Sequence, residues 1–532
     1  MSRLCWRTGL WLALVTLAGF EAAGQSTTLI EAVKRGDHAT ARTLARNRAE
    51  VNRAEVDGTT ALHYAVQAND TELIALLLKA GANAKAANRY GVLPLTMAAT
   101  NGSAAAIDAL LAAGADANGT GPGGEPVLMT AARSGSVDAV RRLLTRGANA
   151  NVVEPWFGET ALMWAASENH GPVVRLLVES GAAVNARSKV LDAPVLEFPR
   201  SGGPNSPLPR GGWTALMFAA REGSIDAARA LAESGADLNA TALPQTDVPL
   251  KPEEIEAAAK GVGTTALVYA IINSHFDLAA LLAEKGADPN VADMAGEAAL
   301  YAAVDMNSLQ WTQGRPAPIF KDKLDAVDLV KILLQKGANP NARLKRTPLK
   351  RHHDAGTTLG LGNGATPLIR AARTNDVPVM KLLLDAGADP FLTLPDRTNA
   401  LMIAAGQGYN GVRGEGIRIV VPTAEGAAEA VQLLLDRGMD PDAFNTAGNT
   451  AVHGAVGRGE AVIRLLASRG ATLNLKNKAG FTPLDLAMGS GGRGRGGRGG
   501  VVRDDIANLL RQLQGLPAPP APGPAPVASA AP

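Results

Sequence analysis

The chain has 532 residues, of which 46% are hydrophobic and only 4% are aromatic. This length allows a large fold, but the scarcity of rings disfavours a single compact core built around them. Lys and Arg number 52 against 50 Asp and Glu, and this balance gives no reason to expect a nucleic-acid partner.

Residues 1–24 have the order of a secretory signal peptide. Arg3 and Arg7 come first, the apolar run "TGLWLALVTLAGF" follows them, and the small residues Ala22 and Gly24 come next. The run is too short for a comfortable transmembrane helix. We therefore expect export, to the periplasm or outside the cell, with cleavage after Gly24. The alternative is an uncleaved N-terminus that tethers the chain to a membrane.

The single cysteine, Cys5, precedes the apolar run, so it is not placed as a lipid-attachment cysteine would be. After cleavage the chain would have no disulfide, no thiol nucleophile and no cysteine-based metal site. No later stretch of the sequence is long and apolar enough to cross a bilayer. The mature protein is therefore predicted to have no membrane contact.

A short string recurs about every 33 residues in the rest of the chain. "TALHYA" is followed by related strings such as "TALMWAA", "TALMFAA" and "TPLIRAA". They start at residues 60, 93, 126, 160, 214, 265, 298, 366, 399, 450 and 482. A degenerate copy precedes the first, so the sequence predicts about twelve repeated units.

Each unit has the pattern of two helices. Thr60 can cap the first helix with its hydroxyl group, and "TELIALLLKA" has the apolar spacing of a second helix. Gly81 is predicted to end that helix, since glycine best adopts the left-handed conformation. The same glycine recurs in later units, as Gly114, Gly147, Gly181, Gly235, Gly286, Gly337, Gly387, Gly438 and Gly470.

These features resemble the ankyrin repeat. The shared residues are the Thr-x-Leu start, the Ala-Ala pair, the Leu-Leu run and the Gly-Ala-Asp/Asn-x-Asn ending, over roughly residues 25–515. The resemblance implies an all-α solenoid of stacked helix pairs, with finger-like turns on one side and no β-sheet core. The family often has a histidine three residues after the Thr, and here only His63 and His453 hold that place. Elsewhere we expect its side-chain hydrogen bond to be lost.

Extra residues interrupt the period in two kinds of place. Three insertions follow the glycine at the fingers, at about 188–210, 241–262 and 344–363, and three lie between the helices of a unit, at about 307–324, 408–425 and 489–502. In the ankyrin family the fingers and first helices border the face where partners dock, so the first set could enlarge that face. Neutral loop drift is the alternative. The tail at 516–532 is rich in Pro and Ala and should be extended and disordered.

No residues predict catalysis or a cofactor. His352, His353 and Asp354 form the only histidine cluster, in a basic loop, but no further metal ligands are spaced to help. A hydrolase or metal-dependent enzyme that uses loop 344–363 is therefore the weaker alternative. "GSGGRGRGGRGG" at 489–500 has no interleaved aromatics, which disfavours RNA binding.

Four residues are candidates for protein binding. Trp213 lies one residue before a capping Thr, where other units have polar residues, so we expect an exposed anchor. Arg133, Arg221 and Arg373 share the place after the Ala pair and could form a guanidinium ladder for an acidic partner. Arg221 could instead pair with Glu222.

Aromatic residues recur just before the Ala pair, as Tyr64, Trp164, Phe218 and Tyr269. Aliphatic residues hold the same place in other units, so packing between helix pairs is favoured over a recognition stripe. The sequence thus predicts an exported, monomeric, non-catalytic scaffold that binds a protein partner on its concave and finger face. It does not identify the partner.

Overall fold

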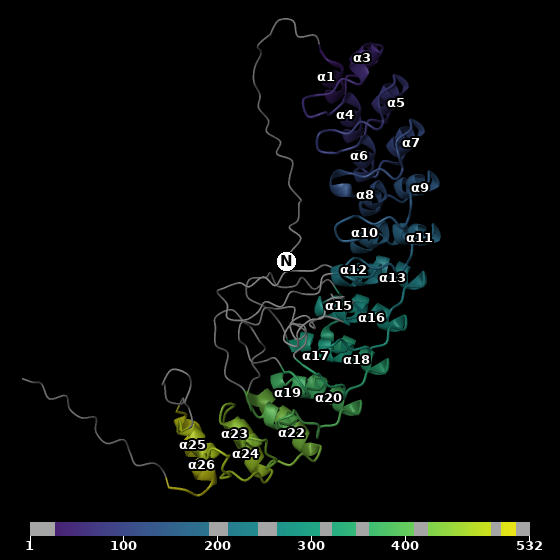
Figure 1. Cartoon of the computed structure of the whole chain (residues 1–532). Helices are drawn as coiled ribbons and strands as arrows, with labels where there is room; N and C mark the ends of the chain where they lie inside the picture. Colours follow the sequence, from purple (N-terminus) through teal and green to yellow (C-terminus); the bar gives the residue numbers. More distant parts are fainter. Residues whose placement is uncertain are drawn as a thin grey trace, which may run out of the picture. The chain divides into compact units, whose positions relative to one another are not determined.

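The computed structural model of the chain describes residues 27–190, 211–242, 263–308, 322–346, 361–408, 424–490 and 502–517. Regular secondary structure in these ranges is helical and contains no β-strand, which confirms the predicted fold class of about twelve helical units. The chain divides into two compact units, one of Met1–Asn101 and Ala105–Asp116, the other of Gly102–Ala104 and Ala117–Pro532. Figure 1 shows that the helices of each unit follow one another as pairs.

The first unit contains the helices nearest the N-terminus. They are α1 (Leu29–Lys34), α2 (His38–Leu44), α3 (Arg48–Val51), α4 (Ala61–Gln67), α5 (Thr71–Lys79), α6 (Pro94–Thr100) and α7 (Ala104–Ala112). Helices α1 and α4 pack together, as do α4 and α6, so the first helices of successive pairs form one layer. We call the first helix of each pair the inner helix.

The second unit continues the same pattern. Its helices are η1 (Pro122–Gly124), α8 (Val127–Ser134), α9 (Val137–Thr145), α10 (Ala161–Ser167), α11 (Gly171–Glu179), α12 (Ala215–Glu222), α13 (Ile225–Glu233), α15 (Ala266–Ile272), α16 (Phe276–Glu284), α17 (Ala299–Ser308), α18 (Ala326–Gln335), α19 (Pro367–Thr374), α20 (Val377–Asp385), α21 (Ala400–Ala404), α22 (Ala424–Asp436), α23 (Ala451–Ala455), α24 (Glu460–Ser468), α25 (Pro483–Ala487) and α26 (Asp504–Leu513). Inner helices α8, α10 and α12 pack in sequence, and α11 packs on α13 behind them.

The Ala pair of each inner helix lies in the core. Ala165 and Ala166 of α10 are fully buried, as are Ala219 and Ala220 of α12. Their small side chains let neighbouring inner helices approach closely, while leucines such as Leu177 fill the space between inner and second helices. A truncation of such a leucine to alanine typically costs about 2–5 kcal/mol.

The repeated Thr lies at the start of an inner helix, where its backbone N–H is bound by the side chain three residues later. The backbone N–H of Thr60 donates to Nδ1 of His63 over 3.2 Å, and the other ring nitrogen lies 3.1 Å from the carbonyl oxygen of Val92. Burial lowers the pKa of His63, which favours the neutral ring. In the last inner helix Asp485 accepts from the backbone N–H of Thr482 over 2.8 Å. The predicted loss of this bond is therefore wrong at Asp485, because a carboxylate can replace the imidazole.

All ten glycines that the sequence places at the end of a second helix have the left-handed conformation. Their φ values lie between +83° at Gly235 and +99° at Gly286. A Cβ atom at Gly286 would meet no other atom within 4 Å. Backbone conformation alone therefore requires glycine at this place.

Replacing Gly286 with valine should lower the free energy of unfolding of its helix pair by roughly 1–3 kcal/mol, because a β-branched residue resists positive φ. In a repeat array part of the loss stays local, so thermal unfolding followed by circular dichroism should broaden or split into two steps. Gly286→Ala is the milder control. An unchanged melting curve for the valine variant would contradict the backbone argument.

A series of asparagines joins each helix pair to the next, and we call this series the asparagine ladder. Nδ2 of Asn290 donates to the carbonyl oxygen of Gly337 over 2.9 Å, and its Oδ1 accepts from the backbone N–H of Asn339 over 2.7 Å. This is the structural reason for the Gly-Ala-Asp/Asn-x-Asn ending. The other asparagines that make both bonds are Asn52, Asn118, Asn151 and Asn341.

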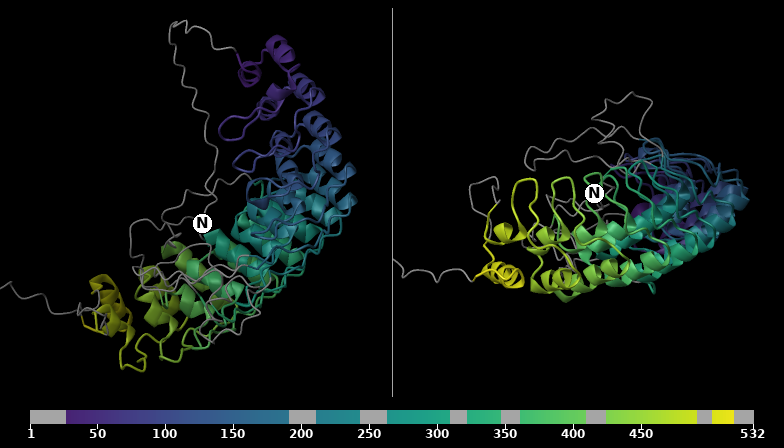
Figure 2. Two further views of the ribbon diagram at one scale, coloured as in Figure 1. Left: turned by 45° about the horizontal axis from the view of Figure 1, so that its top comes forward. Right: turned by 90° about the horizontal axis from the view of Figure 1, so that it is seen from below.

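The turns between pairs form the predicted fingers. Isolated antiparallel bridges close their bases, for example between Val153 and Thr160 and between Thr393 and Asn399. In the second unit the turns project from the same edge of the helix pairs (Figure 2). Each finger therefore lies beside the start of the inner helix that follows it.

The predicted signal peptide, most of each insertion and most of the Pro/Ala-rich tail lie outside the described residues. These predictions, with export and the monomeric state, stay untested. Among the described helices, none combines the length and the hydropathy needed to cross a membrane.

Candidate protein-binding surface

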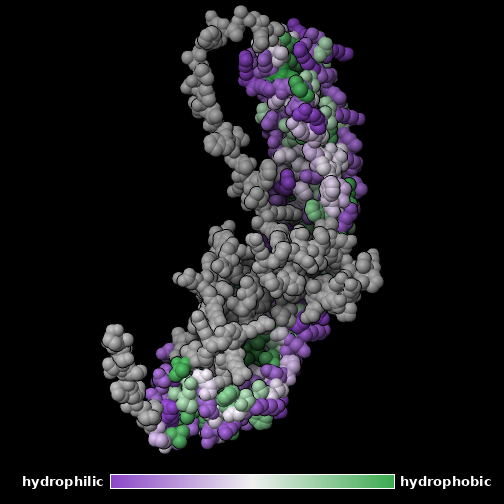
Figure 3. All heavy atoms as spheres, turned by 60° about the vertical axis from the view of Figure 1, so that its left-hand side comes forward, coloured by the Kyte–Doolittle hydropathy of each residue, from purple (hydrophilic) through white to green (hydrophobic). Residues whose placement is uncertain are grey.

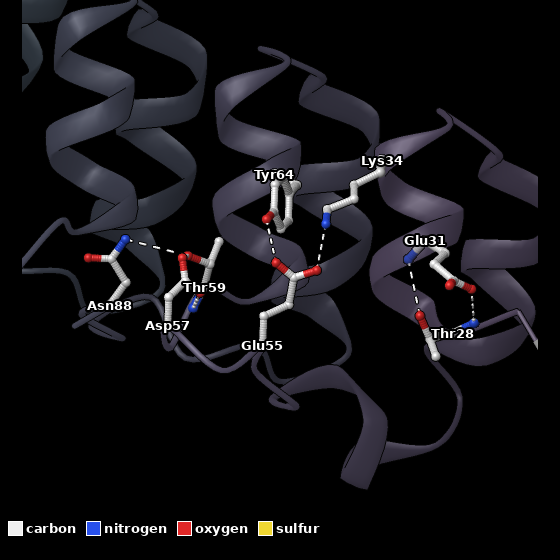
Figure 4. Close-up of polar contacts among 8 residues, drawn as sticks. All are labelled: Thr28, Glu31, Lys34, Glu55, Asp57, Thr59, Tyr64 and Asn88. Atoms are coloured by element: carbon white, nitrogen blue, oxygen red, sulfur yellow. Dashed lines mark hydrogen bonds and ion pairs between the residues drawn. The ribbon is translucent and has the colours of Figure 1, made fainter. Parts of the chain in front are cut away.

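A residue at the end of one inner helix lies against an aromatic side chain of the next inner helix. Nζ of Lys34 lies 4.3 Å from the ring centre of Tyr64, and Cζ of Arg133 lies 4.9 Å from that of Trp164. Figure 4 shows Lys34 and Tyr64 meeting at the carboxylate of Glu55. Such cation–π contacts contribute about 0.5–1 kcal/mol each at exposed sites.

Arg133 is the accessible member of the three predicted arginines. Its side chain is exposed, while Trp164 beneath it is half-buried. Nε1 of Trp164 donates to Oε2 of Glu159 over 2.7 Å, so the indole is fixed in place. The carbonyl oxygen of Arg133 lies 3.0 Å from Nε2 of His170. The sequence therefore placed Arg133 correctly on an open face, above an oriented ring.

Arg221 has a carboxylate partner within its own helix. Its Nε donates to Oε1 of Glu222 over 2.7 Å, the pairing that the sequence offered as the alternative. Cζ of Arg221 also lies 5.0 Å from the ring centre of Trp213 and 5.5 Å from that of Phe218. The guanidinium remains partly accessible, but an acidic partner would compete with Glu222 for it.

Trp213 is half-buried, so its predicted exposure is wrong. Its ring centre lies 5.5 Å from that of Phe218 in an edge-to-face arrangement and 4.9 Å from that of Tyr269. Nε1 is buried and has no hydrogen-bond partner within the described ranges. Trp213 thus contributes to packing between α12 and α15, and a role in protein binding remains a prediction.

Arg373 is buried, with only 5% of its surface exposed, which contradicts the expected open position. Its Nη1 donates to the carbonyl oxygen of Gln407 over 3.0 Å and its Nη2 to that of Gly408 over 2.6 Å. The guanidinium therefore ties the end of α19 to the end of the next inner helix. Of the predicted guanidinium ladder, Arg133 and Arg221 remain accessible.

The aromatic residues that precede the Ala pair divide into buried and partly accessible ones. Phe218 and Tyr269 are 5% and 6% exposed and pack in the core, whereas Tyr64 and Trp164 are half-buried beneath a cation. The same place in α19 holds Arg370, which is 2% exposed and forms an ion pair with Asp305 of α17. Packing between helix pairs therefore explains two of the four aromatic residues, Phe218 and Tyr269.

The sequence reasoning missed two exposed aromatic residues on one finger. Trp156 and Phe157 are 67% and 50% exposed. The backbone N–H groups of both donate to the buried carboxylate of Glu154, over 2.7 and 2.6 Å, and Nε1 of Trp156 donates to the carbonyl oxygen of Gly123 over 2.9 Å. The signal was the "EPWFGE" string, two bulky rings in a turn that elsewhere carries mostly small or polar residues.

This finger carries two adjacent exposed rings, whereas other large exposed rings of the described residues, such as Tyr90, Phe391 and Phe444, occur singly. Figure 3 shows one face of the molecule, on which hydrophobic residues of the described part are scattered among hydrophilic ones. Glu154 holds the backbone of both residues, and Gly123 holds the indole of Trp156, so the Trp156 ring has little freedom to turn away. Rigid exposed aromatic residues of this kind are frequent anchors at protein interfaces.

The described residues hold no group of three His, Cys, Asp or Glu side chains that could bind a metal ion. Loop 344–363, on which the enzymatic alternative rested, lies mostly outside these residues. Burial raises the pKa of Asp293 to about 6, and it raises the pKa of Glu297 well above its usual value. These two carboxyls lie in one finger, and the burial of both side chains accounts for the raised pKa values.

Successive inner helices form one layer, second helices pack behind them, and a finger lies beside the start of each inner helix. The three-copy ankyrin-repeat profile matches residues 29–121, 95–188, 128–242, 323–414 and 419–510, and the single-repeat profile matches 262–294. The chain therefore belongs to the ankyrin repeat family, whose repeats generally mediate protein–protein interactions and which is typically non-catalytic. No curated protein matches the chain.

Proposed function

We propose that this protein is an exported, non-catalytic scaffold that binds a protein partner through its inner helices and fingers. Membership of the ankyrin repeat family supports protein binding in general. The observation that carries the proposal is the pair of exposed rings at Trp156 and Phe157, on a finger whose backbone is bound by the buried Glu154. Export rests on the order of charged, apolar and small residues in the first 24 positions.

The proposed docking surface combines three features of neighbouring helix pairs. Trp156 and Phe157 offer apolar area at the finger, and Arg133 offers a cation above Trp164 on the inner helices. Exposed aromatic side chains contribute most to affinity when a partner buries them. A rim arginine acts mainly on association rate and salt dependence. The partner best suited to this surface presents an apolar side chain flanked by carboxylates.

Replacing both Trp156 and Phe157 with alanine should weaken partner binding at least tenfold and change the free energy of unfolding by no more than about 1 kcal/mol. The rings are exposed, and among the described residues the only side-chain hydrogen bond lost joins Trp156 to Gly123. Mature wild-type and variant proteins would be used as baits in extracts of the source cells, and captured proteins compared by quantitative mass spectrometry.

Phe391→Ala is the matched control, because this ring is 60% exposed but lies on a different finger. A genuine partner is depleted by the double variant and retained by the control. If every protein captured by the wild type is captured equally by the double variant, the proposed surface is wrong. N-terminal sequencing of the exported protein tests the other part of the proposal, since cleavage after Gly24 leaves Gln25 first.

A further inference from the structure

A residue in the left-handed conformation recurs in each finger, two places before the repeated string begins. In every unit with such a string except one this residue is glycine, from Gly58 in the first to Gly480 in the last. The φ values of these glycines lie between +63° at Gly158 and +86° at Gly263. The exception is Arg397, which has a φ of +64° and therefore the same left-handed conformation.

A long side chain is disfavoured at this place for two reasons. In the left-handed conformation a Cβ atom approaches the following carbonyl oxygen too closely. The next finger also leaves little room, since a Cβ atom at Gly448 would lie 2.8 Å from the backbone nitrogen of Lys478. The other non-glycine residues with positive φ in the described ranges are three asparagines and a serine, whose side chains are short and polar. Arg397 is therefore an outlier, and backbone outliers cluster where a side chain has a function.

The side chain of Arg397 is exposed and lies against a ring of the next finger. Its Cζ lies 5.5 Å from the ring centre of Phe444, which is itself 54% exposed. The backbone N–H of Thr446 donates to the carbonyl oxygen of Asp396 over 2.8 Å, so the two fingers are joined beside this pair. Among the described residues the guanidinium has no carboxylate partner.

The acidic side chain beside this cation is engaged within its own finger. Oδ1 and Oδ2 of Asp396 accept from the backbone N–H and the hydroxyl of Thr398, over 3.0 and 2.8 Å. Lys478, on the finger after that of Phe444, is exposed, and its backbone N–H donates to the carbonyl oxygen of Ala447 over 2.9 Å. The exposed ring thus lies on a finger between two fingers that carry accessible cations. A carboxylate is the complementary group, and a guanidinium can bind it through two parallel hydrogen bonds.

We propose that Arg397 and Phe444 form a second docking site, for a segment of a partner protein in which an aspartate or glutamate lies beside an apolar residue. The guanidinium binds the carboxylate, the exposed ring covers the apolar side chain, and Lys478 adds attraction over a longer range. The strained backbone persists because the site requires a long cationic side chain beside the ring. The inference shares with the proposed function the premise that the partner is a protein, but it uses other fingers than that of Trp156 and Phe157.

A library of random peptides displayed on phage and selected on the full mature chain provides the probe. Peptides retained by the wild type but not by Arg397→Gly should be rich in Asp or Glu next to an apolar residue. Binding of such a peptide, measured by fluorescence anisotropy, should weaken at least tenfold in Arg397→Gly and in Phe444→Ala. Added salt should weaken its binding to the wild type more than its binding to Arg397→Gly.

Arg89→Ala is the matched control for the loss of an exposed arginine over a ring. Cζ of Arg89 lies 5.2 Å from the ring centre of Tyr90, but on a finger of the first unit. This variant should bind the peptide as the wild type does, and so should Phe391→Ala, whose exposed ring lies on a finger of the site itself. The double alanine variant at Trp156 and Phe157 should also bind it normally, so that the two docking surfaces succeed or fail separately.

Thermal unfolding separates a binding role of Arg397 from a structural one. Arg397→Gly restores the residue that the other fingers have, so its melting temperature should be no lower than that of the wild type. Arg397→Ala keeps a Cβ atom at positive φ and should melt below the glycine variant. A melting temperature lowered by more than about 2 °C in Arg397→Gly would show that the arginine stabilises the joined fingers.

That result would overturn the proposal. It is also wrong if the selected peptides bind Arg397→Gly as tightly as the wild type, or if the selection yields no acidic peptides.

Discussion

Replacing Asp305 with alanine should lower the free energy of unfolding of the second unit by about 3–5 kcal/mol. Asp305 is the ion-pair partner of Arg370, whose side chain is 2% exposed and whose Nη1 has no hydrogen-bond partner in the described part of the chain. Burial works against the charge of Arg370, but Asp305 and Tyr301 outweigh it, and the pKa of Arg370 is raised. Without Asp305 the buried cation would lose its ion-pair partner.

A double substitution separates the charge from the packing. Asp305→Ala with Arg370→Met removes both charges, and Met97 and Ile403 already hold the place of Arg370 in α6 and α21. Chemical denaturation followed by circular dichroism should show that the double variant recovers most of the stability lost in Asp305→Ala. Equal losses in the two variants would mean that the ion pair is not the cause.

Trp213→Ala should lower the free energy of unfolding by about 2–3 kcal/mol, far more than a change at an exposed residue. The indole packs edge-to-face on Phe218 and lies against Tyr269, so its removal leaves a gap between α12 and α15. Thermal unfolding is the measurement, with Trp213→Phe as the control that should retain most of the stability. A loss below about 0.5 kcal/mol would restore Trp213 as a surface residue.

This expectation also changes how binding to Trp213 must be tested. Loss of binding in Trp213→Ala would follow from either a missing anchor or a loosened helix pair. Binding should therefore be measured at a temperature where circular dichroism shows the variant to be folded. The exposed rings of Trp156 and Phe157 carry no such ambiguity.

The sequence predicted the repeated fold because its signals are local. The capping Thr, the Ala pair and the closing glycine each act within a few residues, and the structure places them as expected. The environment of Trp213 could not be inferred in the same way. Polar residues hold its place in other units, but Thr59 and Glu159 there are 8% and 6% exposed, satisfied by Asp57 and Trp164. The polar residues at the position of Trp213 are therefore hydrogen-bonded and buried, and their polarity did not indicate an exposed position.

Arg373 shows that residues at the same position of two repeats can differ in burial. It shares a sequence place with Arg133, yet one guanidinium is buried and the other is exposed. The difference arises in the neighbouring unit, where "AAGQG" ends the next inner helix and the carbonyl groups of Gln407 and Gly408 accept from Arg373. To predict the burial of Arg373 one must know which residues of the next helix pair face it. The sequence of a single repeat does not contain this information.

Where the asparagine ladder is complete, a helix pair carries both halves of its own connection. The amide of Asn151 donates to the carbonyl oxygen of Gly181 and accepts from the backbone N–H of Ala183 in the following helix pair. The same two bonds recur at Asn52, Asn118, Asn290 and Asn341. The connection also survives a finger insertion, since Asn185 accepts from the backbone N–H of Asp237 across 52 positions. A gene encoding such a chain can therefore duplicate or delete a whole copy by recombination, and the new neighbours will already have matching ends.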